Sequence, residues 1–375
     1  MATYKAEFLS HYYKGRLRPA SAYAMGLIPL WARAASLAPR VANAVARNER
    51  SGALLKSLGG IAPQRGVPSF ARRTFTSWFR GRREVNPAGD PVLLFPDTFT
   101  NCFHPEIAVA ATEVLEAAGR RVVVPAASLC CGRPLYDYGM LDLAERFLRR
   151  ILDQLRPHIT AGVPMVVLEP SCAAVFRDEL TNLLPHDQDA RRLHDQTFML
   201  SELLANRCEG FRPPALSGRA LVQAHCHQKA VIGIRAEQEL LERMGLDVEV
   251  PDSGCCGMAG SFGFEEGEHY RVSVAAGERV ILPKVREASP TTIVVAAGFS
   301  CREQIAQGTD RRALHPAEVL RLAMRDGPQP PKGLPENAAR GDDVIGRSRT
   351  RALVRAAASA ASVSLSAATA LPRKR

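Results

Sequence analysis

Short apolar runs alternate with amphipathic stretches after the first 90 residues. Val92–Pro96, Arg121–Pro125 and Pro164–Leu168 are apolar runs with the length and composition of buried strands. Between them, His104–Ala118 and Asp142–Leu155 place apolar residues three and four positions apart, which predicts helices. Strands that alternate with helices in this way predict parallel βαβ units, in which helices cover both faces of a sheet.

The same order of elements returns further along the chain. The expected elements are a strand at Ala220–Ala224, a helix at Gln228–Met244, a strand at Asp247–Val250, a helix near Glu268–Val285 and a strand at Thr292–Ala297. The sequence therefore predicts an α/β protein with two pseudo-symmetric parallel βαβ modules. We place these tandem modules at residues 89–212 and 213–326.

Both ends of the chain differ from this body. Residues 1–88 are rich in Ala and Arg with few strand signals, so we expect a basic helical extension interrupted at Pro29 and Pro39. Such an extension serves as a membrane-surface or partner-docking element, or as short helices packed on the body. Residues 327–375 are dominated by Pro, Gly, Arg, Ala and Ser, which predicts a disordered tail.

Composition and charge narrow the class of protein. The 375 residues are 46% hydrophobic, an ordinary value for a globular protein, and carry a formal net charge of +11. Residues 1–90 hold a net +11 and residues 327–375 a net +6, which leaves the body at −6 and disfavours nucleic-acid binding. Neither a membrane span nor a signal peptide is expected, so we predict a cytoplasmic protein.

Eight of the nine cysteines form two matching quartets. Cys-Cys-Gly occurs twice, and in each half one cysteine precedes the doublet and another follows it at similar distances. Every one of these cysteines follows a predicted strand, at the edge where open α/β sheets gather ligands, so we expect each quartet to converge. The quartets are Cys102, Cys130, Cys131 and Cys172 in the first half, and Cys226, Cys255, Cys256 and Cys301 in the second.

Three chemistries suit a quartet that contains an adjacent pair. A disulfide between neighbours is strained, because consecutive Cα atoms lie only about 3.8 Å apart, and would act as a redox switch. A single zinc ion takes four thiolates, but usually with two or more residues between ligands. An iron–sulfur cluster holds several irons, so adjacent cysteines can bind different ones. We favour the cluster and keep zinc and dithiol chemistry as alternatives.

Residues beside the cysteines are candidates for a supporting role. Gly132 and Gly257 give the backbone room to turn beside an inorganic core. His104, His225 and His227 flank the first cysteine of each quartet. These histidines would act as ligands or proton donors, or would only form hydrogen bonds around the site.

At these motifs the chain resembles iron–sulfur oxidoreductases with the CCG cysteine-rich domain. The resemblance is strongest to the C-terminal part of FAD-linked oxidases of the D-lactate and D-2-hydroxyglutarate dehydrogenase type. It also extends to the cysteine-rich component of heterodisulfide reductase and to the iron–sulfur subunits of glycolate oxidase and anaerobic glycerol-3-phosphate dehydrogenase. The segments that carry it, within about residues 90–325, are FPDTFTNCFHPE, LCCGRPLYDYG, LEPSCAAVFRDEL, AHCHQKA, DSGCCGMAGSFGFE and GFSCREQI.

One departure from the family pattern concerns the ligand set. The heterodisulfide reductase modules end in Cys-x-x-Cys, whereas Val175 and Gln304 stand where the second cysteine would be. Each half of this chain therefore offers four candidate ligands.

The resemblance implies an iron–sulfur electron-transfer module with 4Fe-4S clusters bound by the two quartets. Electrons would come from FAD on a partner flavoprotein dehydrogenase domain or subunit that oxidises a 2-hydroxy acid, and would leave to a quinone or another carrier. A ferredoxin-like module and a membrane-surface contact at the inner face of the membrane are further implied partners. We find no FAD-binding region or ferredoxin motif, so we expect no dehydrogenase activity from this chain alone. A heterodisulfide-type thiol–disulfide reductase and a zinc-stabilised docking scaffold remain alternatives.

Overall fold

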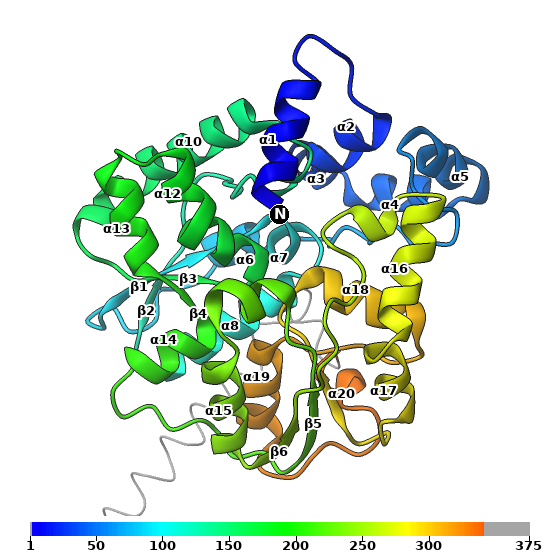
Figure 1. Cartoon of the computed structure of the whole chain (residues 1–375). Helices are drawn as coiled ribbons and strands as arrows, with labels where there is room; N and C mark the ends of the chain where they lie inside the picture. The colour runs from blue at the N-terminus through cyan, green and yellow to red at the C-terminus, as the bar shows by residue number, and fades with distance from the viewer. Residues whose placement is uncertain (1, 341–375) are drawn as a thin grey trace, which may run out of the picture. The chain divides into compact units, whose positions relative to one another are not determined.

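The computed structural model describes residues 2–340. Residues up to Ala339 group into one unit of the fold, which contains both predicted modules and the N-terminal extension (Figure 1). The remainder of the predicted tail, residues 341–375, lies outside the described residues.

A four-stranded parallel sheet forms the centre of the first module. Its strand order is β2-β1-β3-β4, and β1 pairs in parallel with both β2 and β3. The apolar runs predict the first three of these strands, whereas β4 begins with Thr197 and is not part of an apolar run. The strands are β1 (Pro91–Phe95), β2 (Arg121–Val123), β3 (Met165–Val167) and β4 (Thr197–Met199).

A three-stranded parallel sheet forms the centre of the second module. Its order, β6-β5-β7, repeats the order β2-β1-β3 of the first sheet. The predicted α/β class and the pseudo-symmetry of the two halves are therefore confirmed in topology. The strands are β5 (Gly218–Val222), β6 (Leu246–Glu249) and β7 (Ile293–Val295).

Helices join the strands of both modules, and α10 shows why they form. Its apolar residues recur at helical spacing, and Leu148, Ile151 and Leu155 are buried in one core cluster with Met165 and Val167 of β3. The first module contains α7 (Thr98–Cys102), α8 (Pro105–Ala117), α9 (Arg133–Asp137), α10 (Leu141–Thr160), α11 (Pro170–Ala174), α12 (Leu180–Leu183), α13 (Gln188–Gln196) and α14 (Leu200–Asn206). The second contains α15 (Arg235–Met244), α16 (Glu268–Glu278), α17 (Ile281–Glu287), α18 (Phe299–Gly308), α19 (Pro316–Asp326) and α20 (Pro335–Arg340).

Two predicted helices of the second module are interrupted. In place of the expected helix 228–244, the structure has a π-helical segment, η2 (Gln228–Ile232), and then α15. Gly233 separates the two, because its φ of +95° cannot continue a right-handed helix. The expected helix near 268–285 is split into α16 and α17. Pro283 lacks the N–H that a continuous helix would need to bond the carbonyl of Arg279, so the two parts separate there.

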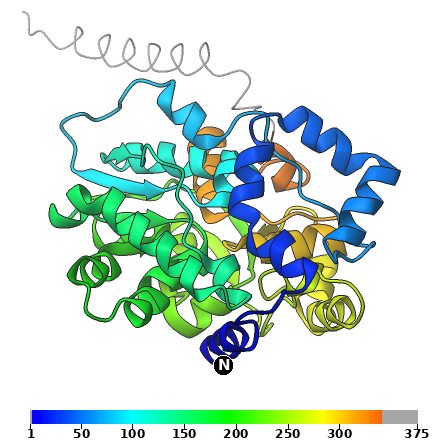
Figure 2. The same cartoon turned by 90° about the horizontal axis from the view of Figure 1, so that it is seen from above.

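The N-terminal extension is helical, as predicted. Pro29 and Pro39 lie at the first turns of α3 and α4, where their missing N–H groups are tolerated. Helices α1, α2, α3 and α6 contact helices of the first module, and in Figure 2 the dark blue α1 lies between the green and yellow segments. The helices are α1 (Ala2–Tyr12), α2 (Ala20–Gly26), α3 (Ile28–Ala35), α4 (Pro39–Arg47), α5 (Glu49–Leu58) and α6 (Phe75–Arg80).

The boundary of the tail lies further along the chain than the composition suggests. The prediction of a disordered tail from residue 327 is wrong for residues 327–340, which pack on the second module. Glu336 of α20 accepts a hydrogen bond from the buried Arg311 at 2.7 Å, and the amide of Ser217 donates to the carbonyl of Pro328 at 2.8 Å. A buried arginine needs such a carboxylate partner, and the Pro-rich composition gives no sign of it.

His315 links the two modules. Its Nε2 lies 3.0 Å from the carbonyl oxygen of Leu168 at the end of β3, and its Nδ1 accepts from the amide of Ala317 at the start of α19. These partners require the neutral ring with its proton on Nε2. Burial lowers the pKa of His315 to about 3.

We expect His315 to make the protein less stable in mild acid. In the unfolded chain a histidine has a pKa of about 6.5, so between pH 6.5 and 3 the unfolded state binds the proton more tightly. The free energy of unfolding should therefore fall by about 2 kcal/mol between pH 7 and 5 through this group. Urea unfolding at the two pH values measures the change.

The variant His315→Asn is the control for this titration. Asn keeps an acceptor for the amide of Ala317 but does not titrate. The variant should be less stable at pH 7, and its loss between pH 7 and 5 should be smaller than that of wild type. Equal losses in both proteins would contradict the assignment.

Candidate functional site

All eight predicted ligand cysteines lie at the carboxyl ends of parallel strands. Cys102 ends α7 after β1, the first doublet follows β2, and Cys172 lies on α11 after β3. In the second module Cys226 follows β5, the doublet follows β6, and Cys301 lies on α18 after β7. The predicted placement on strand-end loops is therefore observed in both modules. All nine cysteines are free thiols.

The second quartet is continuous. Cys255 is hydrogen-bonded to Cys226 and to Cys256, and Cys256 is in turn hydrogen-bonded to Cys301. The hydrogen bonds from its two neighbours lower the pKa of Cys255, and the amide of Gly257 donates to its sulfur at 3.3 Å. The thiolate form that metal ligation requires is thus favoured at one member of this quartet.

Three of the four cysteines of the first quartet are in contact. The sulfur atoms of Cys131 and Cys172 lie 2.8 Å apart, and Cys130 is hydrogen-bonded to Cys131. Cys102 lies to one side, where Asn101 donates to its sulfur at 3.7 Å. It faces Cys130 across a small cavity of about 50 Å³. The structure therefore brings the first quartet together less completely than the second.

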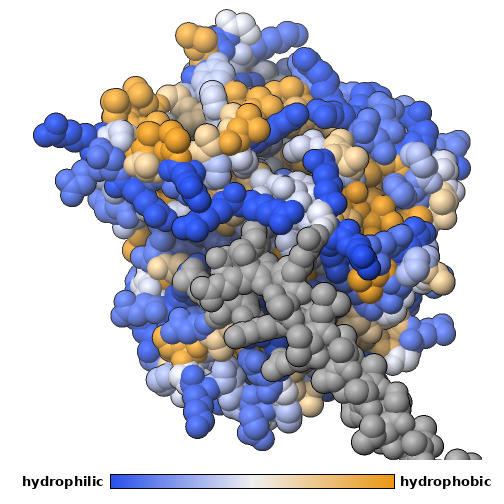
Figure 3. Space-filling model, turned by 180° about the vertical axis from the view of Figure 1, so that it is seen from behind, coloured by the Kyte–Doolittle hydropathy of each residue, from blue (hydrophilic) through white to orange (hydrophobic). Residues whose placement is uncertain are grey.

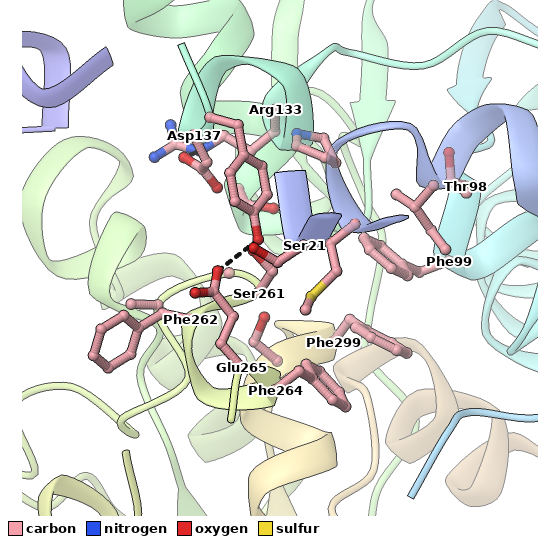
Figure 4. Close-up of a pocket in the computed structure, with 18 of the residues that line it drawn as sticks. Ser21, Thr98, Phe99, Arg133, Asp137, Ser261, Phe262, Phe264, Glu265 and Phe299 are labelled. Carbon is pink, nitrogen blue, oxygen red and sulfur yellow. Dashed lines mark hydrogen bonds and ion pairs between the residues drawn. The ribbon is translucent and has the colours of Figure 1, made fainter. Parts of the chain in front are cut away.

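The two quartets open onto one cavity of about 610 Å³. Residues of the N-terminal extension and of both modules line it, and Figure 4 shows Phe99 and Phe299 on one side and Ser261 and Glu265 on another. The rings of Phe99 and Phe299 stack across the modules with their centres 4.1 Å apart. Six of the predicted ligands contribute to its wall, namely Cys130, Cys131, Cys172, Cys226, Cys255 and Cys256.

Each half of the chain matches a model of a known protein family. A model of the family described as "Cysteine-rich domain", CCG, matches residues 97–177 and 234–306. The first match contains the whole first quartet, and the second begins after Cys226 and contains the other three cysteines. Both halves of the chain are therefore similar to the CCG cysteine-rich domain.

The chain is also similar in sequence to several named proteins. One component of anaerobic glycerol-3-phosphate dehydrogenase from Escherichia coli is 28% identical over 277 residues, which cover 72% of this chain and 69% of that protein. D-2-hydroxyglutarate dehydrogenase from Pseudomonas putida is 27% identical over 329 residues, 84% of this chain but only 32% of that protein. Lactate utilization protein A from Bacillus subtilis is 26% identical over 245 residues, 61% of this chain and 98% of that protein.

The residues at which the sequence departs from Cys-x-x-Cys are packed or hydrogen-bonded in both modules. Val175 is buried in the core of the first domain, at the start of the π-helical segment η1 (Val175–Glu179). Gln304 is buried in the second, and its amide donates to the carbonyl oxygen of Ser273 at 3.0 Å. Four cysteines in each domain therefore remain the candidate set.

Gly132 and Gly257 both have the conformation that the sequence analysis expects. Their φ angles are +82° and +95°, which only glycine adopts without strain. A Cβ on Gly257 would overlap the carbonyl oxygen of Ser273 on α16. The second doublet is thus pressed against α16 by a contact that no other residue type permits.

The three predicted histidines lie in different environments. His104 is paired with Glu106 at 3.0 Å and with Glu303 at 3.6 Å. Burial alone would lower the pKa of His104, but these two carboxylates raise it to about 9. His225 and His227 line the cavity beside Cys226. Burial lowers the pKa of His225 to about 4 and that of His227 to about 3, so both rings are neutral.

The ring of His225 supports the loop that carries Cys226. The Nδ1 atom of His225 accepts from the amide of His227 at 3.2 Å and lies 3.8 Å from the sulfur of Cys226. Its ring also packs against Gly298, where a Cβ would overlap it. His104, by contrast, is directed to carboxylates of two helices. The ring of His225 therefore bonds to its own loop, the Nδ1 of His227 is buried without a hydrogen-bond partner, and the ring of His104 is paired with carboxylates.

Glu169 joins the two domains beside the cysteines, and the sequence analysis misses it. It caps α11, where its Oε1 accepts from the hydroxyl of Ser171 at 2.9 Å, while its Oε2 accepts from the amide of Phe299 at 2.7 Å. It thereby connects the helix of Cys172 with the helix of Cys301. Burial raises its pKa. Only the position of a carboxylate before Pro at a strand end signals a helix cap.

One arginine lies near each Cys-Cys doublet. Arg133 follows the first doublet, and its guanidinium forms ion pairs with Asp137 at 3.0 Å and with Glu179. Arg65 of the N-terminal extension reaches the second domain, donating to the carbonyl of Gly263 at 2.7 Å and to the hydroxyl of Ser273 at 3.0 Å. The charges of Arg133 and Arg65 act on Cys131 and Cys256, respectively. Both cations favour a negatively charged group bound by the doublets.

The thiols of the two quartets are a donor set of the kind that iron–sulfur clusters use. Within residues 2–340, no three His, Cys, Asp or Glu side chains form a ready-made site for one metal ion. Six of the eight thiols are buried, Cys226 is partly exposed and Cys255 is exposed. Each quartet has an adjacent pair, a glycine turn and a nearby arginine, and four thiols match the ligands that iron–sulfur clusters use. Cys208, for which the sequence predicts no role, is buried in the first module outside both quartets.

Proposed function

We propose that this chain is the iron–sulfur electron-transfer component of a flavin-linked dehydrogenase. The observation that carries the proposal is the convergence of six of the eight thiols, from both modules, on one cavity, in a chain whose two halves are similar to the CCG cysteine-rich domain. The names of the relatives, a component of glycerol-3-phosphate dehydrogenase and a D-2-hydroxyglutarate dehydrogenase, support a role beside a dehydrogenase. Electrons would arrive from FAD on a partner flavoprotein and leave to a quinone or another carrier.

The protein's own residues would hold the clusters and set their surroundings. The two quartets would supply eight thiolates for 4Fe-4S clusters, which transfer single electrons when bound. Glu169 would fix the helix of Cys172 relative to the helix of Cys301. The stacked rings of Phe99 and Phe299 would exclude water from the space between the two modules. Arg65 and Arg133 offset negative charge near the doublets.

The N-terminal extension supports a docking role. Its helices expose large apolar side chains, and residues 1–90 carry a net charge of +11. Figure 3, seen from behind, shows hydrophobic side chains gathered between long hydrophilic ones toward the top of the molecule. We assign this surface to the flavoprotein partner or to a ferredoxin-like module. No helix within residues 2–340 has the length and apolar character to span a membrane. The exposed set includes Tyr4, Phe8, Leu30, Trp31, Leu54 and Leu58.

Metal and sulfide analysis tests the proposal directly. Protein purified without oxygen should contain about equal iron and acid-labile sulfide, near four or eight of each per chain for one or two clusters. Zinc without sulfide would replace the redox function by a structural one. Absence of both metals would favour dithiol chemistry of the heterodisulfide type.

A turnover assay provides the second check. The chain with its clusters should not oxidise glycerol 3-phosphate, D-lactate or D-2-hydroxyglutarate with a dye as acceptor, because the flavin belongs to a partner. Activity of the pure chain would contradict the assignment as an electron-transfer component.

A further inference from the structure

One wall of the cavity carries a chain of hydrogen bonds that leads to solvent. The hydroxyl of Tyr138 lies 2.7 Å from the Oγ of Ser261 and 2.7 Å from the Oε1 of Glu265. The other carboxylate oxygen of Glu265 lies 2.7 Å from the Nδ1 of His269. All four side chains line the cavity, and exposure rises outward, from 18% for Glu265 to 49% for His269.

This chain crosses between the two modules and is held in place on both sides. Tyr138 follows α9 in the first domain, where Arg18 donates to its carbonyl at 2.7 Å and to that of Gly139 at 2.9 Å. The ring of His269 packs on Phe262 with the centres 4.3 Å apart. Figure 4 shows Glu265 and Ser261 at this end of the cavity, with the dashed hydrogen bond that reaches Glu265.

Each member can both receive and pass on a proton. Imidazole, carboxylate, phenol and hydroxyl groups all exchange donor and acceptor roles, and distances of 2.7 Å are those of good hydrogen bonds. A clamp between domains would need no exposed imidazole at its end. The order of groups from solvent to cavity is therefore that of a proton pathway.

The part of the cavity away from the cysteines is lined mostly by apolar side chains, as sites for aromatic ligands are. The volume of about 610 Å³ is that of the whole cavity, with its cysteine end included. Tyr138 and Ser261 place hydroxyl groups at one end of this apolar space, where they can orient a carbonyl oxygen. The apolar wall is formed by Met25, Ile28, Ile61, Phe99, Phe264 and Phe299.

We propose that His269, Glu265 and Tyr138 form a proton relay that serves a quinone-type acceptor reduced in this cavity. The inference rests on the proposed function, because the electrons come from the iron–sulfur clusters. For each quinone that becomes a quinol, two electrons leave reduced clusters and two protons enter from solvent. In each transfer, His269 gives its Nδ1 proton to Glu265, Glu265 protonates the oxygen of Tyr138, and the phenol gives its own proton to the quinone oxygen. His269 then takes a proton from water.

A single-turnover measurement separates proton delivery from electron transfer. The protein with its clusters is reduced, excess reductant is removed, and it is mixed either with a water-soluble 1,4-benzoquinone or with ferricyanide. Ferricyanide takes an electron without a proton. Cluster absorbance follows electron loss, and an indicator dye in weak buffer follows proton uptake.

The relay variants should be slow with the quinone only. Tyr138→Phe and Glu265→Gln should slow quinone reduction and proton uptake about 100-fold, the usual scale of a lost proton donor, and leave ferricyanide reduction unchanged. His269→Gln should slow it less and be restored by added imidazole. The quinone reaction of wild type should be slower in D₂O, and the ferricyanide reaction should not.

Matched variants and a binding measurement test the structural alternative. Tyr136→Phe, on α9 two residues before Tyr138, and Glu266→Gln, beside Glu265, should behave like wild type. Calorimetric titration of the quinone into the oxidised protein should give a Kd for Glu265→Gln within about threefold of wild type, because Glu265 passes protons to Tyr138 and not to the ligand.

The outcomes distinguish this inference from the proposed function. Equal slowing of quinone and ferricyanide by Tyr138→Phe would show a structural role and overturn the relay. No slowing of either would also overturn it. Iron and sulfide analysis of the wild-type protein comes first. Absence of clusters would overturn the proposed function and the inference with it. Clusters that are present, together with an unchanged rate of quinone reduction in both variants, would overturn the inference alone.

Discussion

Replacing Cys256 by Ser should remove about half of the iron and sulfide from a chain that binds two clusters. Cys256 is 4% exposed and is hydrogen-bonded to both Cys255 and Cys301, so it lies at the centre of the second quartet. A serine hydroxyl is not a soft ligand and does not ionise near neutral pH, so it cannot replace the thiolate. Iron and sulfide per chain, with the visible spectrum of the protein purified without oxygen, measure the loss.

Cys208→Ser is the matched control for this substitution. Cys208 is also a buried free thiol, at 7% exposure, but it belongs to neither quartet. Its variant should keep the full iron and sulfide content and the wild-type spectrum. Equal loss in the two variants would mean that the second quartet does not bind the cluster, and full retention in Cys256→Ser would mean the same.

The two quartets could be predicted because sequence repeats and strand ends constrain one another. The spacing of the cysteines repeats in both halves, and parallel βαβ units bring the carboxyl ends of their strands to one edge. The topology β2-β1-β3 and β6-β5-β7 then places corresponding cysteines in corresponding loops. The repeat does not reveal that Cys102 lies apart from the other three cysteines of its quartet. Contacts with Asn101 and with α3 keep it there.

The remaining site residues act across long stretches of sequence, which no local pattern reveals. Arg65 contacts Gly263 and Ser273, which are 198 and 208 residues away, and Glu169 contacts the amide of Phe299. Neither residue belongs to a repeated motif. Their contacts exist only because the extension and the two domains pack around one cavity.

The interrupted helices show the same limit at short range. Apolar spacing over 228–244 continues through Gly233, so periodicity alone predicts one helix. The structure instead puts a π-helical turn directly after Cys226. A second π-helical segment, η1, follows α11, the helix of Cys172. π-Helical turns occur often at functional sites. Here both lie next to segments that carry predicted ligand cysteines.

Replacing Gly257 by Ala should destabilise the protein by about 3 kcal/mol or more. The φ angle of +95° costs an L-residue about 1–2 kcal/mol by itself. The added Cβ would also overlap the carbonyl oxygen of Ser273, and that carbonyl cannot withdraw freely because Gln304 donates to it at 3.0 Å. The midpoint of urea unfolding, measured on protein purified without oxygen, reports the change.

Gly254→Ala separates the clash from the backbone strain. Gly254 is three residues earlier in the same loop, has φ +61°, and an added Cβ there meets no atom within 4 Å. Its variant should lose only the cost of the left-handed conformation, about 1 kcal/mol. The difference between the two variants then measures how tightly α16 presses on the second doublet. Equal destabilisation would mean that the loop can move away from Ser273, and the close packing behind Cys255 and Cys256 would not be required for their position.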